Sequence, residues 1–365
     1  MSRYYLHIAV LVAIFSPFVY ANNAAATLHE AEAYLTVQPA RTISLLDNMP
    51  APDKLPLNLA IQRNILLLRA AVPTNDMDRL LQVLDALFEH QQHADFQQEL
   101  TAITSALGIW LRRNNYLHDA QISLSCSYRH SKTERQRLTL TNSMALVARQ
   151  LNDIDHAKTL FEEARRMALQ SGQMNIAAMT ENNLGLLALH EGNLAAAEPH
   201  FRAALAQYQA MDHRAGKISA GINLLFYFVL QHDVTNFQRL YPPTSTLTTN
   251  FPNEAKQALL LWLHQRYLQL QGHAIDLQTK QQLSDAFEQL EDNHVKILIQ
   301  RYLAGELGVD VHADPIINNQ GFNRPWFNSV VACNWPTLSS EKQQTAGTIG
   351  QIGQKNAGLG STGCR

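Results

Sequence analysis

Apolar residues recur along most of this chain at the three- and four-residue spacing typical of amphipathic helices. One unit, at 182–205, reads NNLGLLALHEGNLAAAEPHFRAAL. Forty residues earlier, at 142–165, the chain reads NSMALVARQLNDIDHAKTLFEEAR. The two units share small residues, a polar turn and a large Phe at matching positions. Such a fixed period predicts helical hairpins that stack into a repeat array.

The pattern extends in both directions. Forward by 40 residues, the segment 223–241 fills the same positions, and backward by 37 residues so does 107–124. A small residue in the first helix (Gly108, Ala145 or Gly185) lets the two helices of a hairpin approach closely. A turn that contains Asn, Gly or Asp then reverses the chain.

These positions resemble those of the tetratricopeptide repeat (TPR) family over roughly 105–241. In the best copy, Ala178–Gln209, the resemblance is carried by Leu184, Gly185, Ala197, Phe201 and Ala204. The resemblance implies an all-α fold, an α-solenoid of stacked antiparallel helix hairpins. The copies are longer than the family's usual ~34 residues, as in an exported bacterial type with ~40-residue copies, and Gln209 stands where a proline often closes a copy.

Composition shifts divide the chain into five expected segments. A Pro- and Thr-rich stretch at 242–253 ends the well-matched repeats, and from about Gly308 the helical period disappears. The segments are a signal peptide (1–21), degenerate N-terminal helical repeats (22–104), TPR-like repeats (105–241), C-terminal helical hairpins (254–307) and an irregular, partly disordered tail (308–365).

The N-terminus has the pattern of a secretory signal peptide. Arg3 precedes an apolar run at Ile8–Phe15, and Val19 and Ala21 supply small residues for cleavage after Ala21. An uncleaved membrane anchor is the alternative, although the apolar run is short for one. We therefore expect an exported, periplasmic protein.

The net charge and the absence of catalytic motifs argue against several classes of function. Charged residues make up 16% of the chain, and the net charge of −2 argues against a nucleic-acid partner. No stretch of the mature chain is long and apolar enough to insert into a membrane. His190-Glu191 lacks the second His of a zinc-protease helix, because Leu194 occupies that position. We expect no metal, no cofactor and no catalysis; the residual alternative is an enzyme site around Asp310, His312 and Asp314.

The chain has three cysteines. Cys126 lies near the core-facing Leu124 and is expected to be a buried small residue. Cys333 and Cys364 can pair in an oxidising compartment, and a disulfide between them is the candidate link for the tail, which the sequence leaves open.

A binding groove is the best candidate site. In TPR proteins the first helix of each hairpin lines the concave groove, and an Asn before the Leu-Gly pair often holds the ligand backbone. An Arg one turn after the small position offers a forked donor for a carboxylate. The resemblance therefore implies these groove candidates: Arg112, Arg113, Asn142, Arg149, Gln150, Asn182, Asn183, His190 and Asn223. The alternative is that they are ordinary polar residues on a solvated face.

The sequence thus favours a non-catalytic exported TPR scaffold that binds a protein or peptide partner in its concave groove. The alternative is a periplasmic sensory module related to those of signalling proteins with a cyclase or kinase output, here without an output domain.

Overall fold

The computed structural model describes residues 23–35, 37–249, 251, 253–314 and 321–336. Within these ranges the chain forms helices, turns and loops, with no strand. The expected signal peptide at 1–21 and Cys364 lie outside the described residues. Across the same ranges, no helix has both the length and the apolar character needed to cross a membrane.

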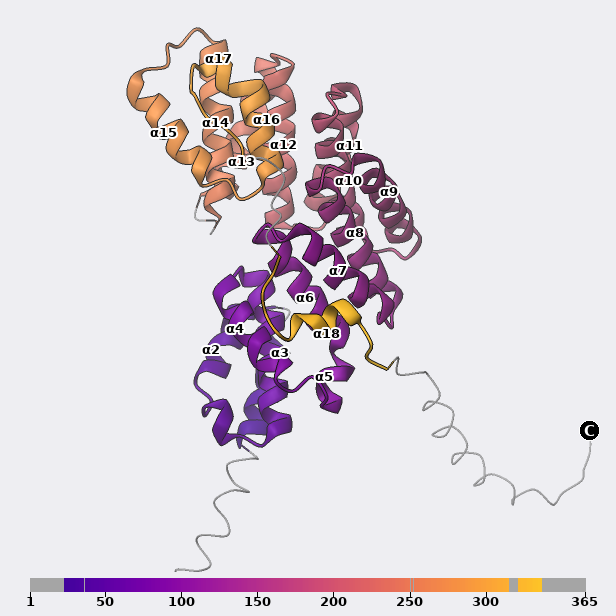
Figure 1. The fold of residues 1–365 in the computed structure, drawn as a ribbon. Coiled ribbons are helices and arrows are strands. Elements are labelled where there is room, and N and C mark those ends of the chain that lie inside the picture. Colours follow the sequence, from indigo (N-terminus) through magenta and orange to yellow (C-terminus); the bar gives the residue numbers. More distant parts are fainter. Residues whose placement is uncertain (1–22, 36, 250, 252, 315–320, 337–365) are drawn as a thin grey trace, which may run out of the picture.

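Successive helices pair into antiparallel hairpins that stack into an α-solenoid (Figure 1), which confirms the predicted fold class. After a helix at 23–34, the N-terminal elements are α2 (Pro39–Asp47), η1 (Pro52–Lys54), α3 (Leu57–Thr74), α4 (Met77–Phe88), α5 (Ala94–Gln98), α6 (Leu100–Arg113) and α7 (Leu117–Arg129). The central hairpins are α8 (Glu134–Gln150) with α9 (Ile154–Gln170), α10 (Met174–His190) with α11 (Leu194–Ala210), and α12 (Arg214–Leu230) with α13 (Val234–Thr248). The C-terminal elements are α14 (Glu254–Leu270), α15 (Leu277–Glu288), α16 (Asn293–Ile299), a π turn η2 (Gln300–Ala304), α17 (Gly305–Leu307) and α18 (Phe327–Ala332).

The first helices of successive hairpins begin at regular intervals. α8, α10, α12 and α14 start at Glu134, Met174, Arg214 and Glu254, each 40 residues after the one before. The helix α14 is therefore in phase with the repeats, although the sequence placed it beyond a break. It packs against α12 as the next first helix of the array.

The turns inside the hairpins explain why each helix ends where it does. Gly192 adopts a left-handed conformation (φ 76°), and Asn193 then caps α11 by accepting a hydrogen bond from the Ala196 backbone N–H over 3.1 Å. Asn152 (φ 62°) and Asp153 play the same two parts before α9. The left-handed backbone conformation favours Gly and Asn, and side-chain oxygens of Asn and Asp accept hydrogen bonds from the free N–H groups at helix N-termini.

The space beside the small residue of each first helix is occupied by a large residue of the second helix. A β-carbon at Gly185 would lie 2.5 Å from Cε1 of Phe201, and one at Gly108 would lie 2.7 Å from side-chain atoms of Leu124. Phe201 and Leu124 are fully buried. The close approach of the paired helices therefore depends on these positions, as the repeat pattern predicts.

The expected break at 242–253 is wrong for its first part, because α13 continues to Thr248 through Pro242 and Pro243. Both prolines lie on the exposed side of the helix, whereas Thr244 on the other side is buried against Gly221. Carbonyl groups freed by proline can reach water at exposed positions, which reduces the cost of keeping the helix.

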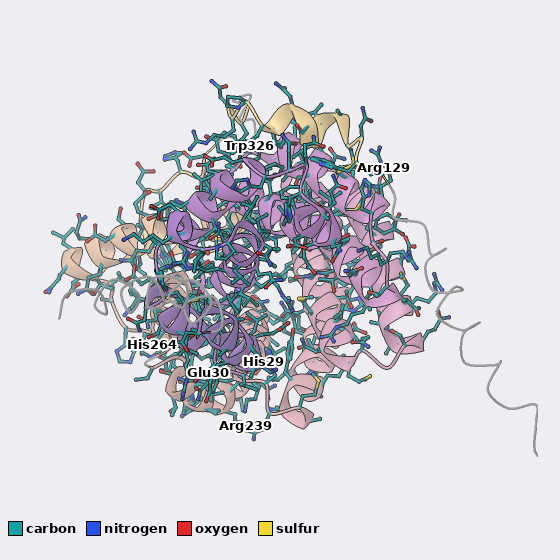
Figure 2. All side chains as sticks on the ribbon, turned by 90° about the horizontal axis from the view of Figure 1, so that it is seen from below. His29, Glu30, Arg129, Arg239, His264 and Trp326 are labelled. Atoms are coloured by element: carbon teal, nitrogen blue, oxygen red, sulfur yellow. A yellow bond between two sulfur atoms is a disulfide. The ribbon has the colours of Figure 1, made fainter. Side chains whose placement is uncertain are left out.

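The tail is not irregular throughout, because residues 321–336 pack onto the N-terminal repeats (Figure 1). The Trp326 ring stacks on Phe88 of α4 with centroids 4.1 Å apart, and its Nε1 donates to Asp85 Oδ1 over 2.9 Å. The Phe322 backbone N–H donates to Asp119 Oδ2 on α7. Figure 2 shows Trp326 beside the docked α18. Aromatic side chains thus anchor a segment that lacks any helical period.

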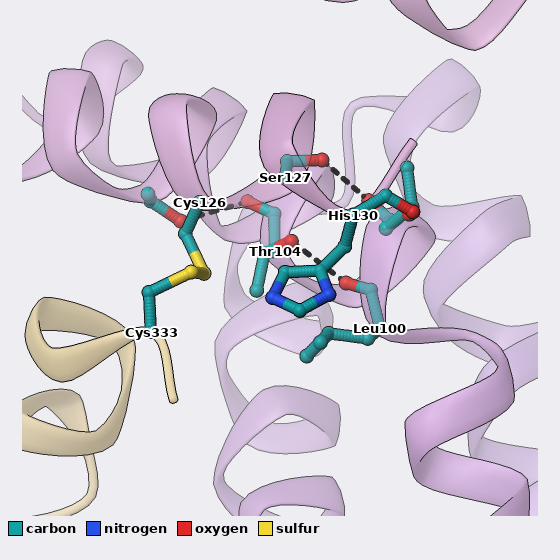
Figure 3. Close-up of a disulfide and its surroundings, with 8 residues drawn as sticks. Leu100, Thr104, Cys126, Ser127, His130 and Cys333 are labelled. Atoms are coloured by element: carbon teal, nitrogen blue, oxygen red, sulfur yellow. Dashed lines mark hydrogen bonds between the residues drawn. A yellow bond between two sulfur atoms is a disulfide. The ribbon is translucent and has the colours of Figure 1, made fainter. Parts of the chain in front are cut away.

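A disulfide fixes this docking, and its partners differ from the candidate pair. Cys333 is bonded to Cys126 of α7, with Cα atoms 5.7 Å apart, so the candidate link from Cys333 to Cys364 is wrong (Figure 3). Both sulfur-bearing residues are buried at the seam between α7 and the tail. The docked aromatic residues bring Cys333 to Cys126 across 207 positions of sequence.

Candidate functional site

The candidate residues lie on the face formed by the first helices α6, α8, α10, α12 and α14, which we call the inner face. Arg112, Arg149, Gln150 and His190 occupy the last turns of α6, α8 and α10. Stacking brings equivalent positions together, so that Arg112 Nη1 donates to Gln150 Oε1 over 3.4 Å. The inner face therefore carries a row of cationic and polar groups drawn from successive repeats.

The four candidate asparagines are buried between neighbouring first helices and are bonded in pairs. Asn183 Nδ2 donates to Asn142 Oδ1 over 3.2 Å, and Asn223 Nδ2 donates to Asn182 Oδ1 over 2.9 Å. These bonds link adjacent repeats and satisfy amides that are removed from water. Asn182 and Asn223 also line a cavity, so they remain within reach of a ligand.

The chain itself covers part of the inner face. The connection between α15 and α16 carries residues 290–292, which we call the acidic tip. Asp292 Oδ2 in this tip accepts a hydrogen bond from Arg149 Nη2 over 2.5 Å. The Arg149 side chain is only 4% exposed, so this candidate is a buried ion-pair partner instead of an open ligand contact.

His190 is covered by the helix that follows the tip. Its ring lies against that of His294 on α16, with centroids 5.0 Å apart, and its carbonyl accepts a hydrogen bond from Arg301 Nη1 over 2.8 Å. His294 is 1% exposed, and neither of its ring nitrogens has a well-formed hydrogen bond. Burial lowers the pKa of His294 to about 4, with Arg149 acting in the same direction and Asp292 opposing it.

The pKa values of the tip region predict a loss of stability in acid. His294 stays neutral in the fold down to about pH 4, whereas an unfolded His binds a proton below about 6.5. The unfolded state therefore binds more protons in this window, and stability falls as the pH drops from 6.5 to 4, by at most on the order of 3 kcal/mol. Although burial raises the pKa of Asp292, Arg149 lowers it to about 2, so its stabilisation disappears at still lower pH.

A His294→Leu variant tests this origin. Its thermal midpoint is expected to depend less on pH between 6.5 and 4 than that of the unmodified protein, in melts recorded across that range. The same pH slope in both proteins would contradict a role for His294.

Two further cations on the inner face are partly removed from water. Burial lowers the pKa of Arg112 to about 10, partly offset by Asp292. Lys256 Nζ on α14 donates to Ser219 Oγ over 2.7 Å; burial lowers its pKa, and Glu291 partly offsets that effect. Sequence reasoning missed Lys256 and the acidic tip, because both lie after the repeats that carry the family resemblance.

Two cavities flank the acidic tip. The first, of about 130 Å³, lies beside Arg112, Arg113 and Gln150. The second, of about 210 Å³, lies beside Asn182, Asn223 and Lys256 and is bounded by α10, α12 and α14. Leu290 and Glu291 line both cavities, so the tip is the wall between them.

The structure gives less support to the alternative enzyme site and to a metal site. Asp310 and His312, the core of the alternative enzyme site, have side chains 95% and 76% exposed. Within the described ranges, one group of three possible metal ligands converges, formed by Cys126, His130 and Cys333. Its two sulfurs are bonded to each other, so they are not available as thiolates in this structure (Figure 3).

No protein-family model matches the chain, and no curated protein matches it. Solved structures do resemble it. A Rap protein complexed with competence and sporulation factor superposes with a TM-score of 0.50 at 13% identity, covering 77% of this chain and 89% of that one. The Rap conjugation gene regulator of plasmid pLS20, in complex with the Phr* peptide, gives a TM-score of 0.54 at 12% identity, covering 78% and 86%. This likeness shows the fold: a TPR-like helical-repeat solenoid.

Proposed function

We propose that this protein is an exported, non-catalytic scaffold that binds a protein or peptide segment on its inner face. The observation that carries the proposal is the acidic tip, because the inner face already holds a short stretch of chain through the ion pair between Arg149 and Asp292. Open cavities continue on both sides of that stretch. The two solved Rap proteins, which share the fold, hold a factor and a peptide. Export is proposed from the apolar leader at 8–15.

Affinity capture with a charge-reversed variant tests this function. Arg113 is exposed on the wall of the smaller cavity, so Arg113→Glu changes the inner face without burying a new charge. The chain from Asn22 onward is expected to retain a specific protein from a periplasmic extract, and the Arg113→Glu form is expected to lose most of it. Quantitative mass spectrometry of the retained proteins measures the difference.

Arg239→Glu is the matched control, because Arg239 is exposed on the second helix α13, away from the inner face. It is expected to retain the same protein as the unmodified chain. Equal retention by all three forms, or by none, would contradict binding at the inner face.

A further inference from the structure

We propose that the inner face binds acidic peptide segments with adjacent carboxylates, and that the acidic tip is a built-in competitor for them. This inference rests on the proposed function and adds to it the chemistry of the ligand and a means of regulation. It is carried by the balance of charge, the unfilled hydrogen-bond donors and the cavities around the tip.

Positive charge on the inner face exceeds the negative charge of the tip. Arg112, Arg113, Arg149 and Lys256 all lie close enough to interact electrostatically with the tip, which offers only two carboxylates. The smaller cavity adds one cation, Lys296, and one carboxylate, Asp314, which leave the excess of positive charge unchanged. Cations removed from water are costly unless they are paired. The excess of cations therefore favours a ligand that brings further carboxylates to this face.

The donors of these cations are incompletely used. Arg149 bonds to the tip through Nη2, while its Nε is buried without a hydrogen-bond partner. Arg112 donates to the neutral amide of Gln150, and Lys256 donates to the neutral hydroxyl of Ser219. A carboxylate placed against a guanidinium accepts two parallel hydrogen bonds, which are stronger than bonds to neutral oxygens. An acidic ligand therefore supplies the charged acceptor oxygens that Gln150 and Ser219 lack.

The space for such a ligand is already present on both sides of the tip. Because the tip is the shared wall of the two cavities, its movement would join them into one groove that runs from Arg112 on α6 to Lys256 on α14. A groove that crosses successive first helices suits an extended segment. Asn182 and Asn223 on its floor carry amide groups that match a peptide backbone.

The tip can leave without unfolding its neighbours. The helices on either side of it are anchored by the fully buried apolar residues Leu283, Phe287, Leu298 and Ile299, which belong to the core around α14. The tip itself contributes the exposed Glu291, the ion pair of Asp292 and one buried apolar side chain, Leu290, which leaves that core when the tip moves. Because it is tethered, the tip competes at a high effective concentration, and an external ligand must displace it.

Fluorescence anisotropy with two synthetic peptides tests the proposal on the full mature chain. The acidic probe is QLEDNHVK, the sequence of residues 289–296, carrying a fluorescein label. The neutral probe is QLQNNHVK, in which both carboxylates are replaced by amides. We expect the acidic probe to bind, with an affinity that weakens as salt is added, and the neutral probe to bind at least about tenfold more weakly.

The competitor is tested by neutralising it. An E291Q/D292N variant is expected to bind the acidic probe about tenfold tighter than the unmodified protein, because the internal carboxylates no longer occupy the cations. The matched control is D285N, which removes an exposed carboxylate of α15 that accepts a hydrogen bond from Gln281 on the same helix. It is expected to leave the affinity unchanged.

If the double variant fails to fold, E291Q alone replaces it, because Glu291 is exposed; a gain of about threefold is then expected. Equal affinity in the neutralised and unmodified proteins, or equal binding of both probes, would overturn the proposal. Such a result leaves the proposed function standing if the Arg113→Glu form still loses its captured protein. If Arg113→Glu also retains its captured protein, both the proposed function and this inference would be contradicted.

Discussion

Removal of the disulfide between Cys126 and Cys333 is expected to destabilise the protein by roughly 2–5 kcal/mol. The bond closes a loop of more than two hundred residues, which restricts the unfolded chain strongly. It also holds the docked segment 321–336 against α4 and α7. A double variant, Cys126→Ala with Cys333→Ala, avoids a free thiol that could pair with Cys364. Chemical denaturation followed by circular dichroism measures the lowered midpoint.

Reduction provides the control for this prediction. A thiol reductant is expected to lower the midpoint of the unmodified protein toward that of the double variant, and to leave the double variant unaffected. Limited proteolysis is expected to reach 321–336 sooner in the variant. Indistinguishable midpoints in the two oxidised proteins would refute the stabilising role of this bond.

Replacement of Gly185 by Leu is expected to cost roughly 1–3 kcal/mol or more, because the added atoms overpack the hairpin of α10 and α11. Even a β-carbon at this position would lie 2.5 Å from the Phe201 ring, which is itself fully buried. The Phe ring and the two helices must therefore move apart. Thermal and denaturant unfolding curves measure the loss.

The same substitution at Gly305 is the matched control. Gly305 is helical and exposed, and a β-carbon there would meet nothing within 4 Å. Because Leu has the higher helix propensity, Gly305→Leu is expected to be neutral or to stabilise by about 0.5–1 kcal/mol. Equal effects at the two glycines would show that the small position in the repeat is not a packing requirement.

The solenoid could be predicted from sequence because its physical requirements are local and repeated. Each hairpin shows its small residue, its turn and its large residue within a short window, as at Gly185, Gly192 and Phe201. The continuation through Pro242 could not be predicted, because the cost of an internal proline depends on whether that side of the helix is exposed. That exposure is set by tertiary packing.

The docking of the tail and its disulfide could not be predicted from the sequence, for a different reason. Trp326 stacks on Phe88 and Phe322 packs edge-on against Tyr116, each more than two hundred residues away, and such contacts leave no periodic pattern. Three cysteines allow several pairings, and spacing does not choose among them. The aromatic residues clustered near Cys333 were the available signal that this segment packs against something.

The candidate site was found in part. Repeat equivalence located Arg112 and Arg149 on one face, because matching positions in stacked hairpins become neighbours. Their charge partner Asp292 was missed, because it lies 143 residues from Arg149 in the chain. A single sequence shows which residues repeat, but it does not show which distant loop folds back over them.

The bond between Cys126 and Cys333 also decides how the molecule responds to mechanical tension. Repeat solenoids unravel hairpin by hairpin when their two ends are pulled, since each unit contacts only its neighbours. Here the force would pass from α7 directly through the sulfur atoms to the tail, bypassing the hairpins from α8 to α17. About 207 residues, on the order of 700 Å of extended chain, are shielded from stretching in this way. Four of the five helices that form the inner face (α8, α10, α12 and α14) would keep their shape under a load that unravels the N-terminal repeats, whereas α6 precedes Cys126 and would not be shielded.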